Sequence, residues 1–133
     1  HSLDRIELAK EIQKRAERIS RLVDVLVQVN VAKEKTKSGI YIEQAYDFVK
    51  EISKYDNLRI RGFMTIAPFV ENPEDVRLVF RELSKLYIDI SRENADNINM
   101  DYLSMGMSND FEVAIEEGSN MVRVGTAIFG KRY

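Results

Sequence analysis

Segments with the apolar spacing of a helix alternate with short Val- and Ile-rich segments along this chain of 133 residues. Helical spacing occurs in residues 4–19, 40–54, 73–90 and 109–117, and the short apolar segments are 22–30, 58–67, 102–106 and 121–124. Helix-length connections join strands that run in the same direction, with one handedness. We therefore expect an α/β fold with parallel strands in a single domain, residues 1–133.

The periodicity leaves two architectures open, an open sheet and part of a closed barrel. A complete (β/α)8 barrel needs about 250 residues, so the strands expected here amount to about half of one. Polar residues mark the expected helix starts: Asp4 or Ser2 can cap the first helix. Asn72 stands directly before Pro73, the usual order of a cap and a first helical residue.

Charge and composition exclude several classes of function. The chain has 20 Lys and Arg against 22 Asp and Glu, so no excess of positive charge favours nucleic acid or a membrane surface. With no Cys and a single His, it has neither a thiolate zinc site nor a histidine metal cluster. No apolar run approaches the roughly 20 residues of a membrane span, and no signal peptide is evident, so we expect a cytoplasmic protein.

Ligands of parallel α/β folds bind where the strands end, which directs attention to the residues after each short apolar segment. The segment 108–110 lies at an expected helix start, and Gly125-Thr126 offers backbone N–H groups and a hydroxyl. Free N–H groups at such positions attract anions. Barrel enzymes commonly hold phosphate on the loops after their last two strands. The sequence therefore indicates a phosphate-binding site at these two segments.

Structural roles are equally compatible with some of these residues. Asn109 and Glu112 have the spacing of a capping box, so Ser108 and Asn109 fit helix capping as well as ligand binding. Arg123, in an otherwise apolar strand, must place its charge on a ligand or against a carboxylate, and both remain open. We expect residues 116–117, two glutamates, to be a solvated helix end.

Several short segments form a specific set of motifs. They are HSLDR at 1–5, VQVN at 27–30, KSG at 37–39, RGFMTI at 61–66, LSMGMSND at 103–110 and MVRVGTAIFG at 121–130. In order and spacing they resemble the pyridoxal phosphate homeostasis proteins, the family of YggS-like and proline-synthase co-transcribed proteins. The resemblance extends over the whole chain.

This resemblance implies a barrel like the N-terminal domain of bacterial alanine racemase, with pyridoxal 5′-phosphate (PLP) at its C-terminal mouth. The family is regarded as carriers or regulators of PLP without an established reaction. By motif, the residues implied to bind PLP are Ser108, Gly125 and Thr126 at the phosphate, Arg123 at the pyridine nitrogen, and Met64, Asn30 and Ser2 around the mouth. An Arg facing that nitrogen suits storage or racemase-like chemistry better than transamination.

The family's Schiff-base lysine, on its first strand, has no counterpart in this sequence. The resemblance begins where the family's fourth strand ends, and Lys37 matches a different family lysine. We therefore expect the C-terminal part of the barrel, with open sheet edges that self-associate or pair with the missing N-terminal half. PLP would then bind weakly and reversibly. Alternatives are a fragment of a PLP-dependent enzyme, such as an amino-acid racemase, and a half-barrel that binds another phosphate compound.

Overall fold

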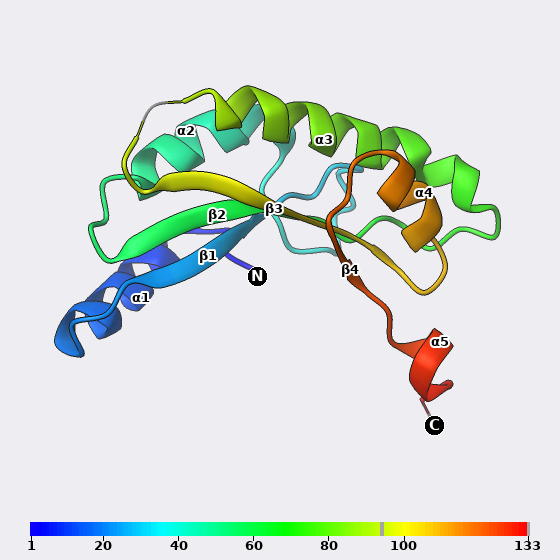
Figure 1. The fold of residues 1–133 in the computed structure, drawn as a ribbon, viewed down its shortest axis with the longest axis horizontal. Coiled ribbons are helices and arrows are strands. Elements are labelled where there is room, and N and C mark those ends of the chain that lie inside the picture. Colours follow the sequence, from blue (N-terminus) through cyan, green and yellow to red (C-terminus); the bar gives the residue numbers. More distant parts are fainter. Residues whose placement is uncertain (94, 133) are drawn as a thin grey trace.

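The expected alternation of helices and strands is present in the computed structural model, which describes residues 1–93 and 95–132. The elements are α1 (Ile6–Arg18), β1 (Val23–Gln28), α2 (Ile42–Ile52), β2 (Leu58–Met64), the 3-10 helix η1 (Pro73–Val76), α3 (Arg77–Ser91), β3 (Ile98–Met107), α4 (Phe111–Glu116), β4 (Met121–Arg123) and α5 (Thr126–Phe129). The short helix α5 was not expected. It follows β4 after residues 124–125 and lies apart from the other helices (Figure 1).

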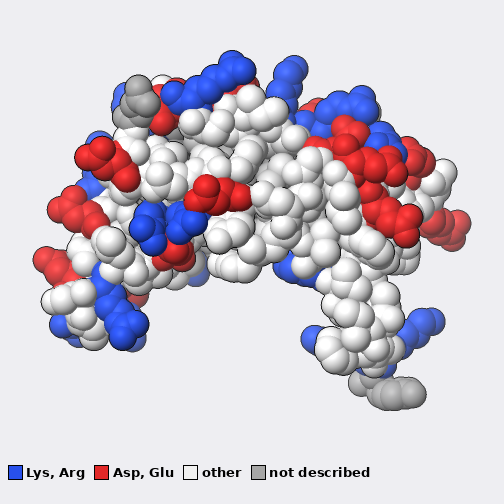
Figure 2. All heavy atoms as spheres, in the orientation of Figure 1, with Lys and Arg blue, Asp and Glu red and all other residues white. Residues whose placement is uncertain are grey.

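The four strands are parallel and follow one another in the order β1-β2-β3-β4. Doubly wound sheets reverse their strand order at a switch point, whereas a barrel wall adds consecutive strands in one direction with helices outside. Consecutive helices are neighbours, and α2 and α3 lie side by side along the same side of the curved sheet (Figure 1). Figure 2 shows the molecule hollowed between α1 and α5, away from α2 and α3. The architecture is therefore the wall of a (β/α) barrel.

Residues before α1 extend this sheet. Leu3 pairs in parallel with Val27 of β1, and Gln28 donates its N–H to the Leu3 carbonyl at 2.9 Å. Val27 also pairs with Phe63 of β2, so Leu3 lies on the other side of β1. Leu3 therefore pairs with β1 in the way that the end of a neighbouring parallel strand would.

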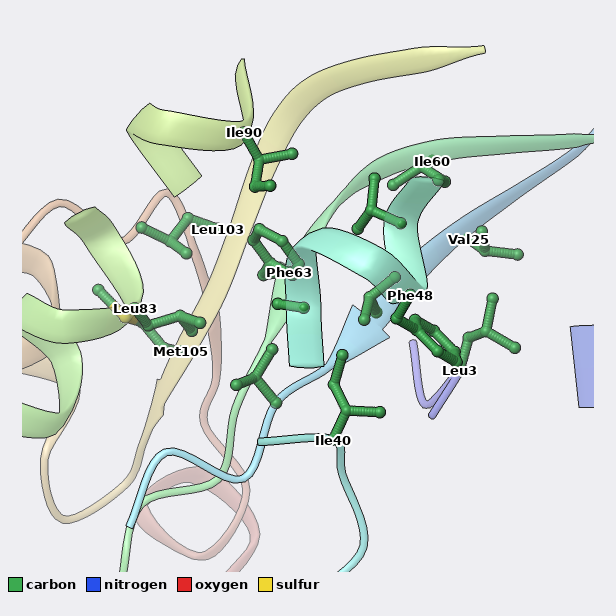
Figure 3. Packing of buried hydrophobic residues seen from close by; sticks show 14 of the residues in the cluster. Leu3, Val25, Ile40, Phe48, Ile60, Phe63, Leu83, Ile90, Leu103 and Met105 are labelled. Atoms are coloured by element: carbon green, nitrogen blue, oxygen red, sulfur yellow. The ribbon is translucent and has the colours of Figure 1, made fainter. Parts of the chain in front are cut away.

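A single apolar cluster fills the space between the sheet and the helices (Figure 3). Phe63 of β2 and Leu103 and Met105 of β3 pack there with Leu83 and Ile90 of α3. All of them are 2% exposed or less. Complete burial of such a side chain stabilises a fold by about 1.5–3 kcal/mol. The burial of Leu83 and Ile90, which helical spacing places on one face of α3, therefore holds this helix against the sheet.

The helix starts agree only in part with their expected caps. Asn72 accepts a hydrogen bond from the Glu74 N–H at 3.1 Å, with Pro73 in the first turn, as expected. The prediction that Asp4 or Ser2 caps the first helix is wrong, because α1 begins after Arg5 without a side-chain cap. The Asp4 carboxylate instead accepts the Gly39 N–H at 3.0 Å, which ties the start of the chain to the loop after β1.

The end of α4 is held by ion pairs rather than solvated. The Glu117 side chain is only 12% exposed and binds Arg77 and Arg81 of α3, at 2.9 Å and 2.7 Å. Arg77 also pairs with Glu74 and Glu116, at 2.7 Å and 2.6 Å. These charges gather over α4 and the start of α3 (Figure 2). The expected solvated helix end is therefore wrong for Glu117, which joins two helices.

This ion pair predicts a contribution to stability that disappears in acid. Hydrogen bonds from Arg81 and Arg77 hold the pKa of the Glu117 carboxyl below its usual range. A lowered pKa means that the stabilisation is complete at neutral pH and is lost as the pH falls through the lowered value. We expect Glu117→Gln to lower Tm at pH 7 and to flatten the fall of Tm in acid, measured by circular dichroism. Glu71→Gln, at an exposed loop position, is the control. Parallel wild-type and Glu117→Gln curves would contradict this role.

Candidate functional site

The carboxyl ends of β3 and β4 lie side by side, because Met107 at the end of β3 pairs with Arg123 at the end of β4. The chain then continues into residues 108–110 after β3 and residues 124–125 after β4. The two segments that the sequence indicated for phosphate therefore meet at one edge of the sheet. The crossover through α4 brings them together from positions well separated in the chain.

The Ser108 hydroxyl bridges the two segments. Its Oγ accepts the N–H of Gly125 at 3.2 Å and the N–H of Ala127 at 3.1 Å. A hydroxyl has two acceptor lone pairs and one O–H, so these bonds leave the Ser108 O–H as a donor. Thr126, between the two N–H donors, is exposed. The arrangement places the free O–H of Ser108, from the loop after β3, against the segment after β4, whose Gly125 and Ala127 N–H groups its oxygen accepts.

The capping alternative for this segment is not what the structure shows. Helix α4 begins after Asp110, without a side-chain cap. The Asn109 amide reaches in another direction and donates to the Val70 carbonyl at 2.7 Å. Of the two alternatives for Asn109, capping is therefore not realised, and the Ser108 hydroxyl is directed to the segment after β4.

Arg123 is half-buried and only partly satisfied. Its Nη2 donates to the Thr65 carbonyl at 2.6 Å, whereas its Nε is buried without a hydrogen-bond partner among the described residues. Burial lowers the pKa of the guanidinium, and the negative charge of Asp110 acts in the opposite direction. The structural ion pair considered for Arg123 is absent from the described part of the chain. The side chain thus keeps a buried donor that is still free.

Thr65 holds the carbonyl that Arg123 binds. Its hydroxyl donates to the Val29 carbonyl at 2.6 Å, and its N–H donates to the Ser104 carbonyl at 3.0 Å. It is completely buried. Two neighbouring segments therefore fix the point from which the Arg123 guanidinium is positioned.

The remaining candidates lie at different places around this edge. Met64 ends β2 and pairs with Gln28 and Ser104. Phe63 belongs to the cluster under the helices, so Met64 faces the opposite side of the sheet. Asn30 is buried, but its amide donates to the Glu34 carbonyl at 2.8 Å and its carbonyl accepts the Glu34 N–H at 3.0 Å.

The side chain of Asn30 is thus used inside the loop after β1. Ser2 is exposed next to the paired residue Leu3. The structure brings together Ser108, Gly125, Thr126 and Arg123, with Met64 next to Thr65, whose carbonyl binds Arg123. It does not bring the side chains of Asn30 and Ser2 into hydrogen-bond contact with them.

Sequence reasoning assigned no role to several groups that build this site. The Ala127 N–H and the Thr65 carbonyl are backbone atoms, which no side-chain pattern reveals. The Asp110 carboxylate accepts the Met107 N–H at 2.7 Å, a local contact for which the short spacing of the two residues was the available signal.

Two further properties of the described chain concern membranes and metal ions. None of its helices is long and apolar enough to cross a bilayer. Residues 1–93 and 95–132 contain no group of three or more His, Cys, Asp or Glu side chains placed to hold a metal ion.

Comparison with known proteins relates this chain to a family. The model of the alanine racemase N-terminal domain matches residues 1–133. The chain belongs to this family. A relative from Aquifex aeolicus, named pyridoxal phosphate homeostasis protein, is 50% identical over 132 residues, which are 99% of this chain and 57% of that protein. The chain spans a little over half the length of the curated relatives that it matches.

Several solved structures have the same fold. An unknown protein from Bifidobacterium adolescentis is 38% identical with a TM-score of 0.90, over 97% of this chain and 51% of that one. PipY of Synechococcus elongatus PCC7942 with PLP bound is 28% identical with a TM-score of 0.83, over 98% of this chain and 59% of PipY. Alanine racemase of Clostridium difficile 630, at 18% identity and a TM-score of 0.68, shares the fold alone.

Proposed function

We propose that this chain is the phosphate- and pyridine-binding part of a PLP-binding barrel that serves PLP homeostasis as a carrier or regulator. The observation that carries the proposal is the meeting of Ser108, Gly125 and Arg123 at the carboxyl ends of β3 and β4. The name of the Aquifex aeolicus relative and the PLP bound to PipY support it. The racemase alternative has only a distant likeness of fold in its favour.

The phosphate end of PLP fits the segment around Ser108. The Ser108 O–H can donate to a phosphate oxygen while its Oγ keeps the Gly125 and Ala127 N–H groups in place. Apart from Gly125 itself and its two neighbours in the chain, no described heavy atom lies within 4 Å of the position that a Cβ on Gly125 would take, so a ligand can approach the backbone there. Hydrogen bonds to a charged phosphate are stronger than neutral ones.

The ring end of PLP fits Arg123. Its buried and unpartnered Nε requires an acceptor, and an unprotonated pyridine nitrogen is one. Because arginine stays charged, it does not accept a proton from the ring and keeps the nitrogen unprotonated. PLP supplies a reactive aldehyde on an electron-withdrawing ring, and this environment weakens the ring as an electron sink. Such a site holds PLP without favouring transamination.

Self-association remains part of the proposal. Ile128 and Phe129 of α5 are 67% and 85% exposed. Large exposed apolar side chains of this kind favour contact with another chain or with the rest of a barrel. Light scattering coupled to size exclusion measures the oligomeric state directly.

Titration with two related ligands tests the proposed function. PLP and pyridoxine 5′-phosphate share the ring and the phosphate, but pyridoxine 5′-phosphate has no aldehyde and does not react with surface lysines. We expect saturable binding of both, measured by calorimetry, and competition by inorganic phosphate. A chain that binds neither ligand more tightly than inorganic phosphate would contradict the proposal and favour a general phosphate site.

Substitution of Arg123 tests the ring end separately. We expect Arg123→Leu to weaken pyridoxine 5′-phosphate binding about tenfold, because a hydrogen bond from a charged donor is lost. Competition by inorganic phosphate should stay unchanged. Arg21→Leu, at an exposed position before β1, is the control for loss of an arginine. If both affinities fell together, the assignment of Arg123 to the ring would be wrong.

A further inference from the structure

The Asp110 carboxylate shapes the turn that carries Ser108. Asp110 is only 8% exposed and stands directly before α4, but its side chain does not cap that helix. Its Oδ1 instead accepts the Met107 N–H at 2.7 Å, while its own N–H donates to the Met107 carbonyl at 3.1 Å. The two bonds close a turn with Ser108 and Asn109 at its tip. The direction of the Ser108 hydroxyl therefore depends on Asp110.

The same carboxylate is linked to the other end of the site through the Met107 backbone. Met107, which Asp110 holds, is the strand partner of Arg123. Among the described residues, Arg123 forms no salt bridge. Burial lowers the pKa of the Arg123 guanidinium, and the negative charge of Asp110 raises it. A buried charge without such compensation tends to leave its position for solvent. Asp110 thus favours the buried placement of Arg123.

We propose that Asp110 is a positioning residue for both ends of the ligand. It directs the Ser108 hydroxyl to the phosphate through the turn with Met107, and it keeps the Arg123 guanidinium at the ring through its charge. Asp110 itself touches neither end of the ligand in this role. The inference rests on the proposed function and assigns to Asp110 the alignment of its two anchors.

Two substitutions at Asp110 separate the hydrogen bond from the charge. Asp110→Asn keeps an oxygen that can accept the Met107 N–H but removes the charge, whereas Asp110→Ala removes both. We expect Asp110→Asn to weaken pyridoxine 5′-phosphate binding severalfold, because a charge that favours the buried guanidinium is lost, and to leave competition by inorganic phosphate unchanged. Asp110→Ala should weaken both. Asp101→Asn is the matched control, because Asp101 of β3 is exposed and pairs with Arg61 of β2, away from the proposed site.

A double-mutant cycle with Arg123→Leu gives a result that a merely structural role would not give. Because the charge of Asp110 acts through Arg123, Asp110→Asn should have no further effect on ligand affinity in the Arg123→Leu background. The inference would be overturned if the losses of ligand affinity in Asp110→Asn and Arg123→Leu multiplied in the double variant. Wild-type affinity of Asp110→Asn would overturn it too, even where Asp110→Ala does not fold.

The outcomes also distinguish this inference from the function on which it rests. Wild-type binding that is lost in Ser108→Ala but kept in Asp110→Asn would leave the proposed function standing and refute the role of Asp110. A wild-type chain that binds neither PLP nor pyridoxine 5′-phosphate would refute both.

Discussion

Ser108→Ala is expected to lower the affinity for PLP about 10- to 100-fold. The substitution removes the O–H that we assign to the phosphate and deprives the Gly125 and Ala127 N–H groups of their acceptor. Hydrogen bonds to charged groups contribute about 1.5–3 kcal/mol each, and 1.4 kcal/mol corresponds to a factor of ten. The loss of order in the segment after β4 adds to the loss of the direct contact.

Calorimetric titration with PLP and with inorganic phosphate measures this effect. Both affinities should fall together for Ser108→Ala, in contrast to Arg123→Leu, because the hydroxyl serves the phosphate that the two ligands share. Ser91→Ala is the matched control, since the Ser91 hydroxyl donates to a carbonyl within α3, outside the proposed site. An unchanged PLP affinity in Ser108→Ala would argue against a phosphate site at the ends of β3 and β4.

Gly62→Ala is expected to destabilise the fold by about 3 kcal/mol or more. A Cβ on Gly62 would lie 1.7 Å from the Tyr102 carbonyl oxygen on the neighbouring strand, so β2 and β3 cannot keep their present separation. Excess volume in a packed region costs about 1–3 kcal/mol and sometimes more, and here the obstacle is backbone rather than a flexible side chain. The irregular register between Ile60 and Gly62 lies at the same place.

Thermal and urea unfolding monitored by circular dichroism measure this loss. A domain of this size loses several degrees of Tm for each kcal/mol, so a fall of roughly 10 °C is expected. Gly125→Ala is the control, because Gly125 has open space where its Cβ would lie and a negative φ of −114°. Equal stability of Gly62→Ala and Gly125→Ala would show that the strands can separate at Gly62 without cost.

Local features of this protein could be predicted from its sequence. The spacing of Phe80, Leu83 and Ile90 predicts the face of α3 that is buried, because a helix repeats every 3.6 residues. Asn72 directly before Pro73 predicts a helix cap, because capping also depends only on residues that are close together in the chain. Arg123 was identified as unusual because a charge in an apolar strand needs a special environment, and its buried Nε agrees with that.

Contacts between distant segments could not be predicted in this way. The residue type and position of Asp4 predict a helix cap, but its carboxylate accepts the Gly39 N–H. Those of Glu117 predict a solvated side chain, but it binds Arg77 and Arg81. Asn109 has capping-box spacing but reaches Val70. In each case the partner is supplied by another element, so the outcome depends on how the elements pack.

The sequence by itself determined the alternation of helices and strands, their parallel direction and the segments that could bind phosphate. These follow from periodicity and from the length of each connection, which are local properties of the chain. The resemblance of its motifs implied the barrel, which the structure confirms, but only the tertiary structure showed the strand order β1-β2-β3-β4 and the contact of the Ser108 hydroxyl with the N–H groups of Gly125 and Ala127. Strand order and backbone contacts depend on how successive helices cover one face of the sheet. The sequence pattern of a single strand is the same in an open sheet and in a barrel wall.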